Sequence, residues 1–392
     1  MLSVALSSTL PAQSGSVSSS ASVFDGAANQ EAANPGALSD LGSIQRTPET
    51  PPCARKKRGE IAAAPIPVVN PTIGNGLAGA VLYMSNLGPC IAGIPPSTFG
   101  LVGLRTSSGS WALGGGANLI LHGDLFRISV GGGIGEFNYK FYGIGNAAGA
   151  KDISIGIGQR SKAFLIEPKV RVFRRWYVGP RYHIVKTTAH IDQASSSESS
   201  DPMLPDGDLK LRTAALGLRT QHDSRDSQFY PRQGSFFDQT LDFYEGAFGG
   251  NRSYRSYELA YSKFLSFGSK NVLAVHGSLC TTWGPTPFYD LCALGLSRDL
   301  RGYPLGRYQD HRFLSAQVEY RRELFWRIGG VAFMGAGEVG KTFSDFNASD
   351  ILPGGGLGLR FLLSRASHVN LRLDYALGRD SHALYLGMTE AF

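Results

Sequence analysis

Side chains alternate between apolar and polar along most of the chain after residue 58, and this pattern constrains the fold more than any other feature. Residues 313–321 read FLSAQVEYR, residues 369–377 read VNLRLDYAL and residues 163–172 read AFLIEPKVRV. In each segment the apolar residues fall mainly on every second position, with polar or charged residues between them. Successive side chains of a β-strand point to opposite faces, so a period of two predicts strands.

Sixteen segments of this kind follow one another, separated by turns rich in Gly, Asp, Ser and Asn. Short connections such as 107–110 and 378–381 alternate with longer polar ones, notably 192–208. This arrangement is typical of an up-and-down meander of antiparallel strands. We expect strands at 72–84, 97–107, 110–121, 125–134, 136–143, 161–173, 176–190, 209–222, 235–247, 252–266, 270–283, 311–325, 326–340, 354–364, 367–378 and 382–392.

Alternation alone fits two folds, because the apolar face points inward in a soluble β-sandwich and outward in a membrane barrel. No run reaches the roughly 18 apolar residues of a transmembrane helix, and a closed barrel is the other structure that satisfies every backbone group in lipid. Charged residues make up only 18% of the chain, below the roughly 25% of typical soluble domains. About 330 residues of strand–turn repeats also exceed one sandwich.

The polar faces and the segment ends carry residues that suit a barrel. Charges of both signs on the polar faces fit an enclosed wet lumen, and aromatic residues near segment ends fit girdles at the two membrane interfaces. The sequence therefore predicts an all-β protein, a 16-stranded antiparallel transmembrane β-barrel. The polar-face residues are Glu167, Lys169, Arg171, Arg181, His183, Glu258, Glu319, Arg321, Arg372 and Asp374, and the aromatic residues are Trp111, Phe137, Tyr139, Trp176, Tyr177, Phe236, Phe237, Trp283, Phe325 and Trp326.

Residues 1–58 differ in texture from the rest of the chain. Ser, Ala, Pro, Gly and Asn dominate them and apolar clusters are absent, so they bury too little surface to offset the entropy cost of ordering. We expect a disordered, low-complexity segment at 1–58 and the barrel at 59–392. The start, MLSVALSSTLPAQS, has no basic residue and only a short apolar part, which does not match a secretory signal.

No motif predicts a catalytic residue, a metal site or a cofactor site. Neither GxSxG nor HExxH occurs, and the glycine-rich stretches 131–137 and 143–149 lack the βαβ context of a phosphate loop. The net charge of +7 does not predict nucleic-acid binding, because RKKR at 55–58 is the only basic cluster. No two cysteines have CxxC spacing. Cys280 and Cys292 flank one connection, and they either form a disulfide in an oxidising compartment or stay free thiols.

Five stretches, in order along 59–392, resemble the outer-membrane assembly and transport superfamily. That family includes BamA, TamA and two-partner secretion transporters, and it shares the bacterial surface antigen barrel domain. LRGYPLGRYQD at 300–310 is similar to its sixth-loop motif, a hydrophobic residue followed by Arg-Gly and an aromatic residue. The others are NPTIGNGLAGAVLYM at 70–84, DSRDSQFYPRQGSFF at 223–237, VEYRREL at 318–324 and VAFMGAGEVG at 331–340. The last residue, Phe392, resembles the terminal aromatic of a bacterial outer-membrane sorting signal.

The resemblance implies a sixteen-stranded barrel with an inward-folded loop. Its arginine, Arg301, would pair with Glu319 on the polar face of the next strand, since a guanidinium fork matches a carboxylate. The family often has a second acid where this chain has Gly335; Glu338 lies three residues on with opposite parity, and whether it replaces that acid stays open. The loop latch motif comprises Leu300, Arg301, Gly302 and Tyr303.

A seam between the first strand, 72–84, and the last, 382–392, is the second expected moving part. Glycines add no side-chain pairing, so the seam is expected to be weak. The assembly proteins of the family carry periplasmic repeats before the barrel, and residues 1–58 are too short for one, so we expect this chain to lack them. The seam residues are Gly74, Gly76, Gly79, Gly387 and Phe392.

The leading functional prediction is a non-enzymatic barrel that assists insertion or translocation of a polypeptide or lipid, or that acts as a gated transport pore. The alternative is a passive porin-like or structural barrel with no assembly activity. Expected partners are the lipid bilayer of the outer membrane, a polypeptide or lipid cargo and a separate periplasmic partner, with no cofactor and no nucleic acid. The expected location is the bacterial outer membrane, with an organellar outer envelope as the alternative.

Overall fold

The computed structural model describes residues 59–70, 72–88, 94, 96–151, 153–192, 209–227, 229–295, 299–364 and 368–392. The disorder expected for residues 1–58 lies outside the described residues, as do Cys53 and Cys90.

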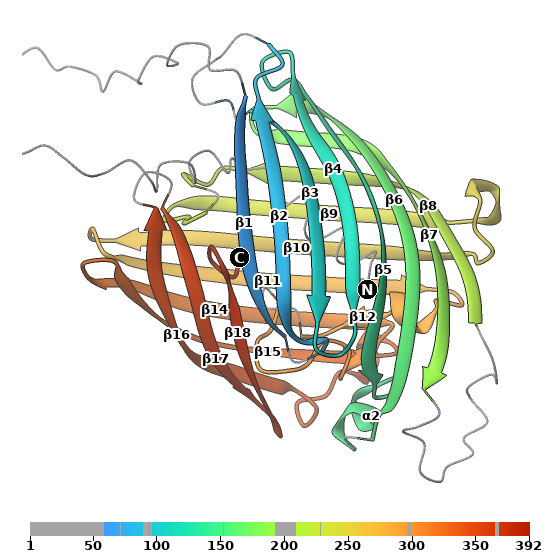
Figure 1. Ribbon diagram of the computed structural model, residues 1–392. Helices are drawn as coiled ribbons and strands as arrows, with labels where there is room; N and C mark the ends of the chain where they lie inside the picture. The colour runs from blue at the N-terminus through green and yellow to red at the C-terminus, as the bar shows by residue number, and fades with distance from the viewer. Residues whose placement is uncertain are drawn as a thin grey trace, which may run out of the picture.

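Sixteen antiparallel strands form one closed barrel in the described part of the chain (Figure 1). Each strand pairs with the next one along the chain and β1 returns to β18, which gives an up-and-down meander. No helix within these ranges has the length and apolar character needed to cross a membrane. The barrel strands are β1 (Glu60–Asn70), β2 (Gly74–Ser85), β3 (Ser97–Thr106), β4 (Trp111–Leu121), β5 (Phe126–Phe141), β6 (Ile155–Phe173), β7 (Trp176–Asp192), β8 (Leu209–Asp223), β9 (Gly234–Tyr244), β10 (Tyr254–Phe267), β11 (Asn271–Trp283), β14 (Arg312–Phe325), β15 (Ile328–Gly340), β16 (Leu352–Ser364), β17 (Val369–Gly378) and β18 (Ser381–Met388). The connections hold β12 (Cys292–Ala293), which pairs with β13 (Gln309–Asp310), together with α2 (Asn146–Ala150), η3 (Gly246–Phe248), η4 (Phe288–Asp290) and η5 (Phe343–Asp345).

The expected fold and the number of barrel strands are confirmed, but two of the expected segments are wrong. Segments 125–134 and 136–143 form a single strand, β5, in which glycines at 131–133 and 135 interrupt the alternation that marks one strand. These glycines have a packing reason. A Cβ atom on Gly133 would lie 2.9 Å from the carbonyl oxygen of Leu113, so β4 comes too close for a side chain there.

The strand that the sequence did not predict is β1, which reads EIAAAPIPVVN. Its apolar run lacks clear alternation and holds two prolines, which cannot donate ladder hydrogen bonds and argue against a central strand. Pro65 and Pro67 are two residues apart, so their missing N–H groups fall on the same edge of the strand. A strand of this kind is tolerated at the end of a sheet, where one edge forms few hydrogen bonds.

The barrel closes between β1 and β18, and this closure is short. Among the described residues, Val69 and Leu386 form the single ladder pair between the two strands, whereas β1 pairs with β2 along its whole length. The two strands are antiparallel, so the residue two positions after Leu386 lies opposite the residue two positions before Val69. In this register Met388, the last residue of β18, faces Pro67. Residues 60–66 of β1 therefore run past the end of β18.

The unpredicted strand moves the seam by one strand from its expected place. Gly74, Gly76 and Gly79 lie on β2 and do not border the seam, because β1 stands between them and β18. Gly387 does lie on β18, but Phe392 lies beyond the end of that strand. Thr389 has a positive φ of 66°, and after it the chain leaves the wall and enters the lumen, where Phe392 contacts His276 and Arg321.

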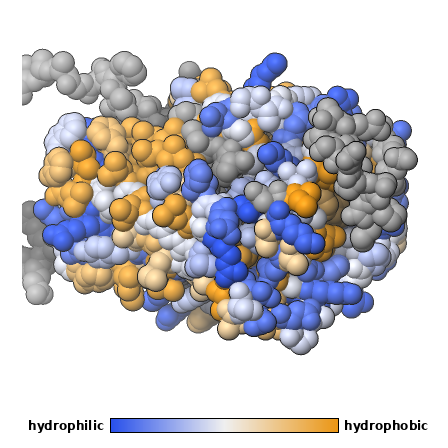
Figure 2. Space-filling model, turned by 90° about the horizontal axis from the view of Figure 1, so that it is seen from below, coloured by the Kyte–Doolittle hydropathy of each residue, from blue (hydrophilic) through white to orange (hydrophobic). Residues whose placement is uncertain are grey.

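The two faces of the wall are inverted relative to those of a soluble protein. On β17, Leu373, Tyr375 and Leu377 are 39%, 49% and 54% exposed, whereas Asp374 and Ala376 between them are fully buried. Figure 2 shows apolar residues spread over one side of the molecule, with hydrophilic residues gathered beside them. An apolar outer wall around a charged interior is the pattern of a membrane-embedded barrel.

Only part of the expected aromatic girdle lies on the outside. Trp283 and Trp326, at strand ends, are 43% and 72% exposed, as an interfacial girdle requires. Phe137, Tyr139 and Tyr177 are buried instead, because their parity directs them into the lumen.

The longest connections lie at one end of the barrel, although residues 107–110 and 379–380 form short turns at that end and residues 224–233 form a longer connection at the other. At this other end, residues 174–175 join β6 to β7, residues 268–270 join β10 to β11, and residues 326–327 join β14 to β15. At the end with the longest connections, residues 284–311 join β11 to β14 and residues 341–351 join β15 to β16. We call these the turn end and the loop end. Membrane barrels place short turns on the periplasmic side and long loops outside.

The inverted wall leads to a first prediction. Leu359, near the middle of β16, is 56% exposed on the outer face, so Leu359→Arg is expected to lower the free energy of unfolding in lipid vesicles by about 2–4 kcal/mol. Urea titration of the reconstituted barrel measures this change. Ile351→Arg is the control, because Ile351 is 40% exposed in the connection before β16 and is expected to change little. Equal effects of the two variants would contradict a lipid-facing wall.

Candidate functional site

The loop motif at 300–303 lies against the inner wall of the barrel and is excluded from solvent. The side chains of Leu300, Arg301 and Tyr303 are 0% exposed. The motif belongs to the connection between β11 and β14, residues 284–311, which we call the lumenal loop; residues 284–295 and 299–311 of it are described. The inward-folded loop that the resemblance implied is therefore present.

The Arg301 guanidinium binds acidic groups from two different strands. Its Nη2 lies 2.5 Å from Oε2 of Glu319 on β14, and its Nη1 lies 2.7 Å from Oδ2 of Asp374 on β17. Its Nε donates a hydrogen bond of 3.0 Å to Oε1 of Gln317. The centre of the guanidinium also lies 3.4 Å from the ring centroid of Phe333 on β15, a cation–π contact that a desolvated site strengthens. One side chain thus ties the loop to three strands.

Two glycines allow the loop backbone to approach the wall. Gly302 has φ of 115°, and a Cβ atom there would lie 2.8 Å from the carbonyl oxygen of Leu377. Gly378 on β17 leaves space for the Tyr303 ring, which a Cβ atom would meet at 2.6 Å. Both distances are too short for real side chains, so these positions require glycine.

Tyr303 extends the attachment along the loop end of β16 and β17. Its hydroxyl donates to the carbonyl oxygen of Pro353 at 2.6 Å and accepts from the backbone N–H of Arg379 at 2.8 Å. Burial raises the pKa of the Tyr303 phenol, so it keeps the proton that the first of these bonds needs. The backbone N–H of Gly302 donates to the hydroxyl of Tyr385 on β18 at 3.1 Å. The motif therefore reaches the seam strand as well.

The structure brings Arg301 and Glu319 together, but the second acid differs from the one considered from the sequence. Glu338 does not reach Arg301; its Oε1 accepts from the backbone N–H of Asn347 at 2.7 Å, because its parity on β15 is opposite to that of Phe333. Asp374 supplies the second carboxylate instead. An acid at Gly335 would not fit, since a Cβ atom there would lie 2.5 Å from the carbonyl oxygen of Ala316 and 3.0 Å from Cδ1 of Leu300.

The arginine belongs to a larger group of buried charges that we call the latch cluster. Glu319 also binds Arg321 at 2.6 Å, and Asp374 also binds Arg360 at 2.5 Å. Nε of Arg360 reaches Oε2 of Glu390, in the tail after β18, at 2.8 Å. Each carboxylate in the chain of contacts is shared by at least two arginines, so the loss of any one charged side chain weakens the compensation of its neighbours. The latch cluster consists of Arg301, Glu319, Arg321, Arg360, Asp374 and Glu390.

A second group of buried charges lines strands β6 to β9, and we call it the wall cluster. Glu167 accepts from Lys169 at 2.8 Å and from Arg219 at 3.1 Å. Arg219 also binds Asp238 at 2.6 Å, and Arg181 binds Asp242 at 3.1 Å. The polar face of these strands was predicted to line the lumen; in the structure the six charges of this group are paired with each other, and all but Asp238, whose side chain is 16% exposed, are nearly excluded from solvent. The wall cluster consists of Glu167, Lys169, Arg181, Arg219, Asp238 and Asp242.

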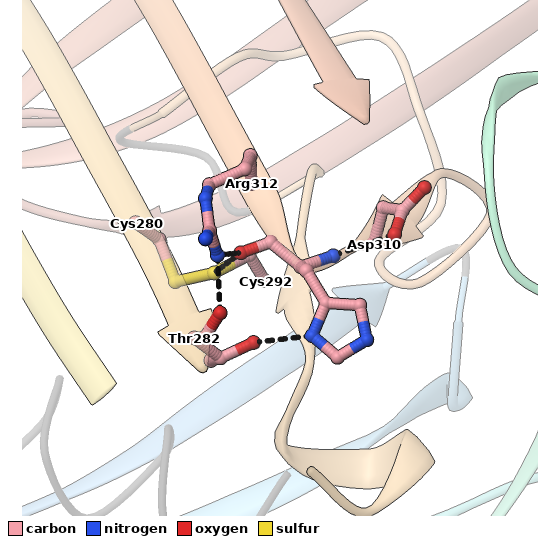
Figure 3. Close-up of a disulfide and its surroundings, with 6 residues drawn as sticks. Cys280, Thr282, Cys292, Asp310 and Arg312 are labelled. Carbon is pink, nitrogen blue, oxygen red and sulfur yellow. Dashed lines mark hydrogen bonds between the residues drawn. A yellow bond between two sulfur atoms is a disulfide. The ribbon is translucent and has the colours of Figure 1, made fainter. Parts of the chain in front are cut away.

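A disulfide ties the base of the lumenal loop to the wall (Figure 3). Cys280 on β11 and Cys292 on β12 form a disulfide, with their Cα atoms 5.6 Å apart. Of the two alternatives that the sequence left open, a disulfide or free thiols, the structure has the disulfide. Beside it, Oγ1 of Thr282 lies 3.0 Å from Nδ1 of His311, and Arg312 donates to the carbonyl oxygen of Thr282. The loop is thus held covalently at its start and by ion pairs further on.

The tail after β18 fills part of the lumen. The ring of Phe392 stacks on His276 of β11, with centroids 4.9 Å apart, and its carbonyl oxygen accepts from Nη2 of Arg321 at 3.1 Å. β11 lies on another part of the wall from β18, with β14 to β17 between them. The terminal phenylalanine therefore faces the interior rather than the lipid.

The described residues offer no arrangement of three or more His, Cys, Asp or Glu side chains that would hold a metal ion. A cavity of about 110 Å³ lies between the lumenal loop and the wall, and it is lined in part by Tyr289, Asp290 and the disulfide.

Residues 121–388, more than half of the chain, match the family model of the Omp85 superfamily domain. The chain belongs to the Omp85 superfamily. The family resemblance drawn from the loop motif and its four companions is thereby confirmed. No curated protein sequence matches the chain.

Three solved structures share the Omp85 barrel fold with this chain at low sequence identity. BamA from Haemophilus ducreyi lacking POTRA domains 1–3 has 14% identity and a TM-score of 0.55, over 85% of this chain and 70% of that one. CdiB from Escherichia coli has 12% identity and a TM-score of 0.60, over 84% and 62%. CdiB from Acinetobacter baumannii has 11% identity and a TM-score of 0.52, over 84% and 59%. The chain thus spans less than two thirds of either CdiB chain.

Removing the Arg301 side chain is expected to destabilise the barrel. Arg301→Ala leaves Glu319 and Asp374 buried without their shared counterion, and breaking a buried pair typically costs about 3–5 kcal/mol. The measurements are the urea midpoint in detergent and the mobility shift of unboiled protein on gels. The control is Arg160→Ala, which breaks an exposed pair with Glu136 and should cost less than about 1 kcal/mol. Unchanged mobility and midpoint in Arg301→Ala would contradict the latch.

Breaking the disulfide is expected to loosen the base of the loop. Cys280→Ser should lower the free energy of unfolding by about 2–4 kcal/mol, since the bond closes a short segment of the unfolded chain. Cys292→Ser should have the same effect, and the double variant should be no worse than either single one, because all three remove one bond. Additive losses in urea titrations would show that the two residues act separately.

Proposed function

We propose that this chain is an outer-membrane barrel that inserts or translocates a polypeptide or lipid cargo without enzymatic chemistry, using the seam between β1 and β18 as a lateral gate. The observation that supports this most is the length of the seam, a single ladder pair among the described residues, Val69 with Leu386. An exposed strand edge presents unpaired N–H and C=O groups that can pair with another chain. The edge of β1 along residues 60–66 is of this kind.

The lumenal loop acts in this proposal as a plug that stays in place. It is held by the disulfide at Cys292 and by the two ion pairs of Arg301. Withdrawing it would require breaking buried pairs at about 3–5 kcal/mol each, whereas opening the seam disrupts one ladder pair. The lateral route is therefore the less costly one, and it favours a cargo that moves along the wall over one that passes through the lumen.

The alternative of a passive pore is less well supported. A pore of that kind needs a continuous path for water, and the loop, the tail and the paired charges of both clusters lie inside the lumen. The side chains of Arg301, Glu319 and Glu167 are 0% exposed, which is unlike the wet interior of a porin.

The proposed location is the bacterial outer membrane, with the turn end facing the periplasm. The proposed partners are the lipid bilayer, a polypeptide or lipid cargo and a separate periplasmic protein that delivers it. The apolar wall supports the first of these, and the free edge of β1, which begins at the turn end, supports the second and third.

A locked seam tests the lateral gate. Val69→Cys with Leu386→Cys places two cysteines at a ladder pair, where antiparallel geometry permits a disulfide. The oxidised variant should lose the ability to promote insertion of an unfolded barrel protein into liposomes, and a reductant should restore it. The control places the cysteines at Leu357 and Tyr375, a pair within the continuous β16–β17 ladder, and should stay active. Full activity of the locked seam variant would overturn the proposal.

A further inference from the structure

A second cavity, of about 170 Å³, lies at the turn end of the barrel, and the proposed function does not use it. It lies beside the two-residue turn between β14 and β15, and the turn between β10 and β11 and the connection between β16 and β17 also contribute to its lining. We call it the turn pocket. The side chains that matter for its chemistry are Lys270, Arg321, Arg322, Arg327, Arg360 and His368 on the basic side and Glu323 on the acidic side.

The turn pocket has more positive charge than its neighbours neutralise. Glu323, the single acid among the described residues that line it, is already bound by Nη1 of Arg232 at 3.0 Å and lies 3.6 Å from Nε2 of His368. Nη1 of Arg327 reaches only backbone carbonyl oxygens of residues 362 and 363, at 3.3 and 3.4 Å. Within the described ranges, no carboxylate forms a salt bridge with Lys270, Arg322 or Arg327.

One buried arginine in the pocket has an unused donor. Arg360 is 3% exposed; its Nε and Nη1 bind Glu390 and Asp374, but its Nη2 has no hydrogen-bond partner among the described residues. An unsatisfied guanidinium nitrogen out of water is costly. An anion seated in the pocket adds negative charge beside this group and beside the three unpaired basic side chains.

The outer side of the same pocket is apolar and faces lipid. Phe325 and Trp326 are 67% and 72% exposed, and Leu324 is 43% exposed. Arg322 follows the buried Arg321 and has the opposite parity, so its side chain starts from the lipid-facing row of β14. A long basic side chain at the edge of such a row can extend to the headgroup layer while its stem stays in the apolar region. The pocket therefore joins a cationic recess to a membrane-facing surface.

We propose that the turn pocket binds the phosphate headgroup of an anionic phospholipid from the leaflet at the turn end. Phosphate oxygens suit a recess of arginine and lysine donors, and an acyl chain suits the exposed apolar residues next to it. The proposal rests on the lipid-facing wall and not on the seam, so its outcome is independent of the lateral gate. Through Arg360 and Asp374, the pocket is two ion pairs away from Arg301.

A neighbouring turn provides a matched control for a binding test. Residues 174–175, Arg174 and Arg175, join β6 to β7 at the same end of the barrel, as Trp326 and Arg327 join β14 to β15. Arg174 and Trp326 have similar φ values of 42° and 52°. The double variant Arg174→Gln with Arg175→Gln thus removes the same charge from the same rim as Arg322→Gln with Arg327→Gln, but outside the pocket.

The test is native mass spectrometry of the full chain released from mixed micelles of phosphatidylglycerol and phosphatidylcholine with identical acyl chains. The unaltered protein should retain phosphatidylglycerol preferentially. Arg322→Gln with Arg327→Gln should reduce that preference by about 25-fold, since each of the two basic side chains beside an anionic headgroup contributes roughly a fivefold gain in affinity. Arg174→Gln with Arg175→Gln should keep it. The gel mobility of unboiled protein reports whether both variants are folded.

Four outcomes would overturn the proposal. They are equal retention of the two lipids, equal loss of preference in both double variants, binding of inorganic phosphate with no retained lipid, and displacement of phosphatidylglycerol by an acidic peptide at lower concentration. Competition by inorganic phosphate that lowers phosphatidylglycerol retention in the unaltered protein, but not in Arg322→Gln with Arg327→Gln, would support recognition through the phosphate group.

Discussion

Charged groups that leave water have to be paired, and the lumen of this barrel is organised around that requirement. Arg301 is fully buried, so it has to contact Glu319 and Asp374, and these contacts determine where the lumenal loop lies. The same carboxylates are shared with Arg321 and Arg360. The loop cannot withdraw without taking away an arginine that helps to compensate both acids in a region of low dielectric constant. A long connection that would otherwise be free to move is therefore part of the interior.

The space for this arrangement comes from residues with no side chain on the facing strands. Leu300 lies where Gly335 and Gly354 leave room, and the Tyr303 ring lies over Gly378. This packing explains why the second acid comes from β17 rather than from position 335. A carboxylate at 335 would occupy the volume of Leu300, whereas Asp374 reaches Arg301 from the neighbouring part of the wall. The ion pairs of Arg301 and the close approach of the loop backbone to the wall therefore belong to the same contact between the loop and the strands.

Most of the wall follows from the sequence, because alternation with a period of two is a local property. The same period assigned Glu319 to the lumenal face, so its pairing with Arg301 needed only the position of the loop. β1 was missed because Pro65 and Pro67 obscure a strand that has one nearly unpaired edge, and β5 was divided because glycines have no polarity to alternate. The roles of Asp374 and Glu390 depend on which strands become neighbours on closure, and a single sequence carries no signal of that. The sequence also did not predict the inward turn at Thr389, because the apolar–polar alternation of a strand continues through the last residues of the chain.

The pairing requirement also bears on the seam. Glu390 is held in the lumen by Arg360 at 2.8 Å and by the side-chain amide of Asn370 at 2.8 Å, so the chain after Met388 cannot continue along the wall beside β1. The tail after Met388 turns into the lumen, where its Glu390 completes the latch cluster. Because the tail does not continue along the wall, residues 60–66 of β1 have no paired strand on the side of β18. β18 itself is tied to the loop, because the hydroxyl of Tyr385 accepts from the backbone N–H of Gly302. On the proposed function, opening the seam therefore displaces β1 and leaves β18, the loop and the buried charges in place. A cargo strand can then pair with β1 without any ion pair being broken.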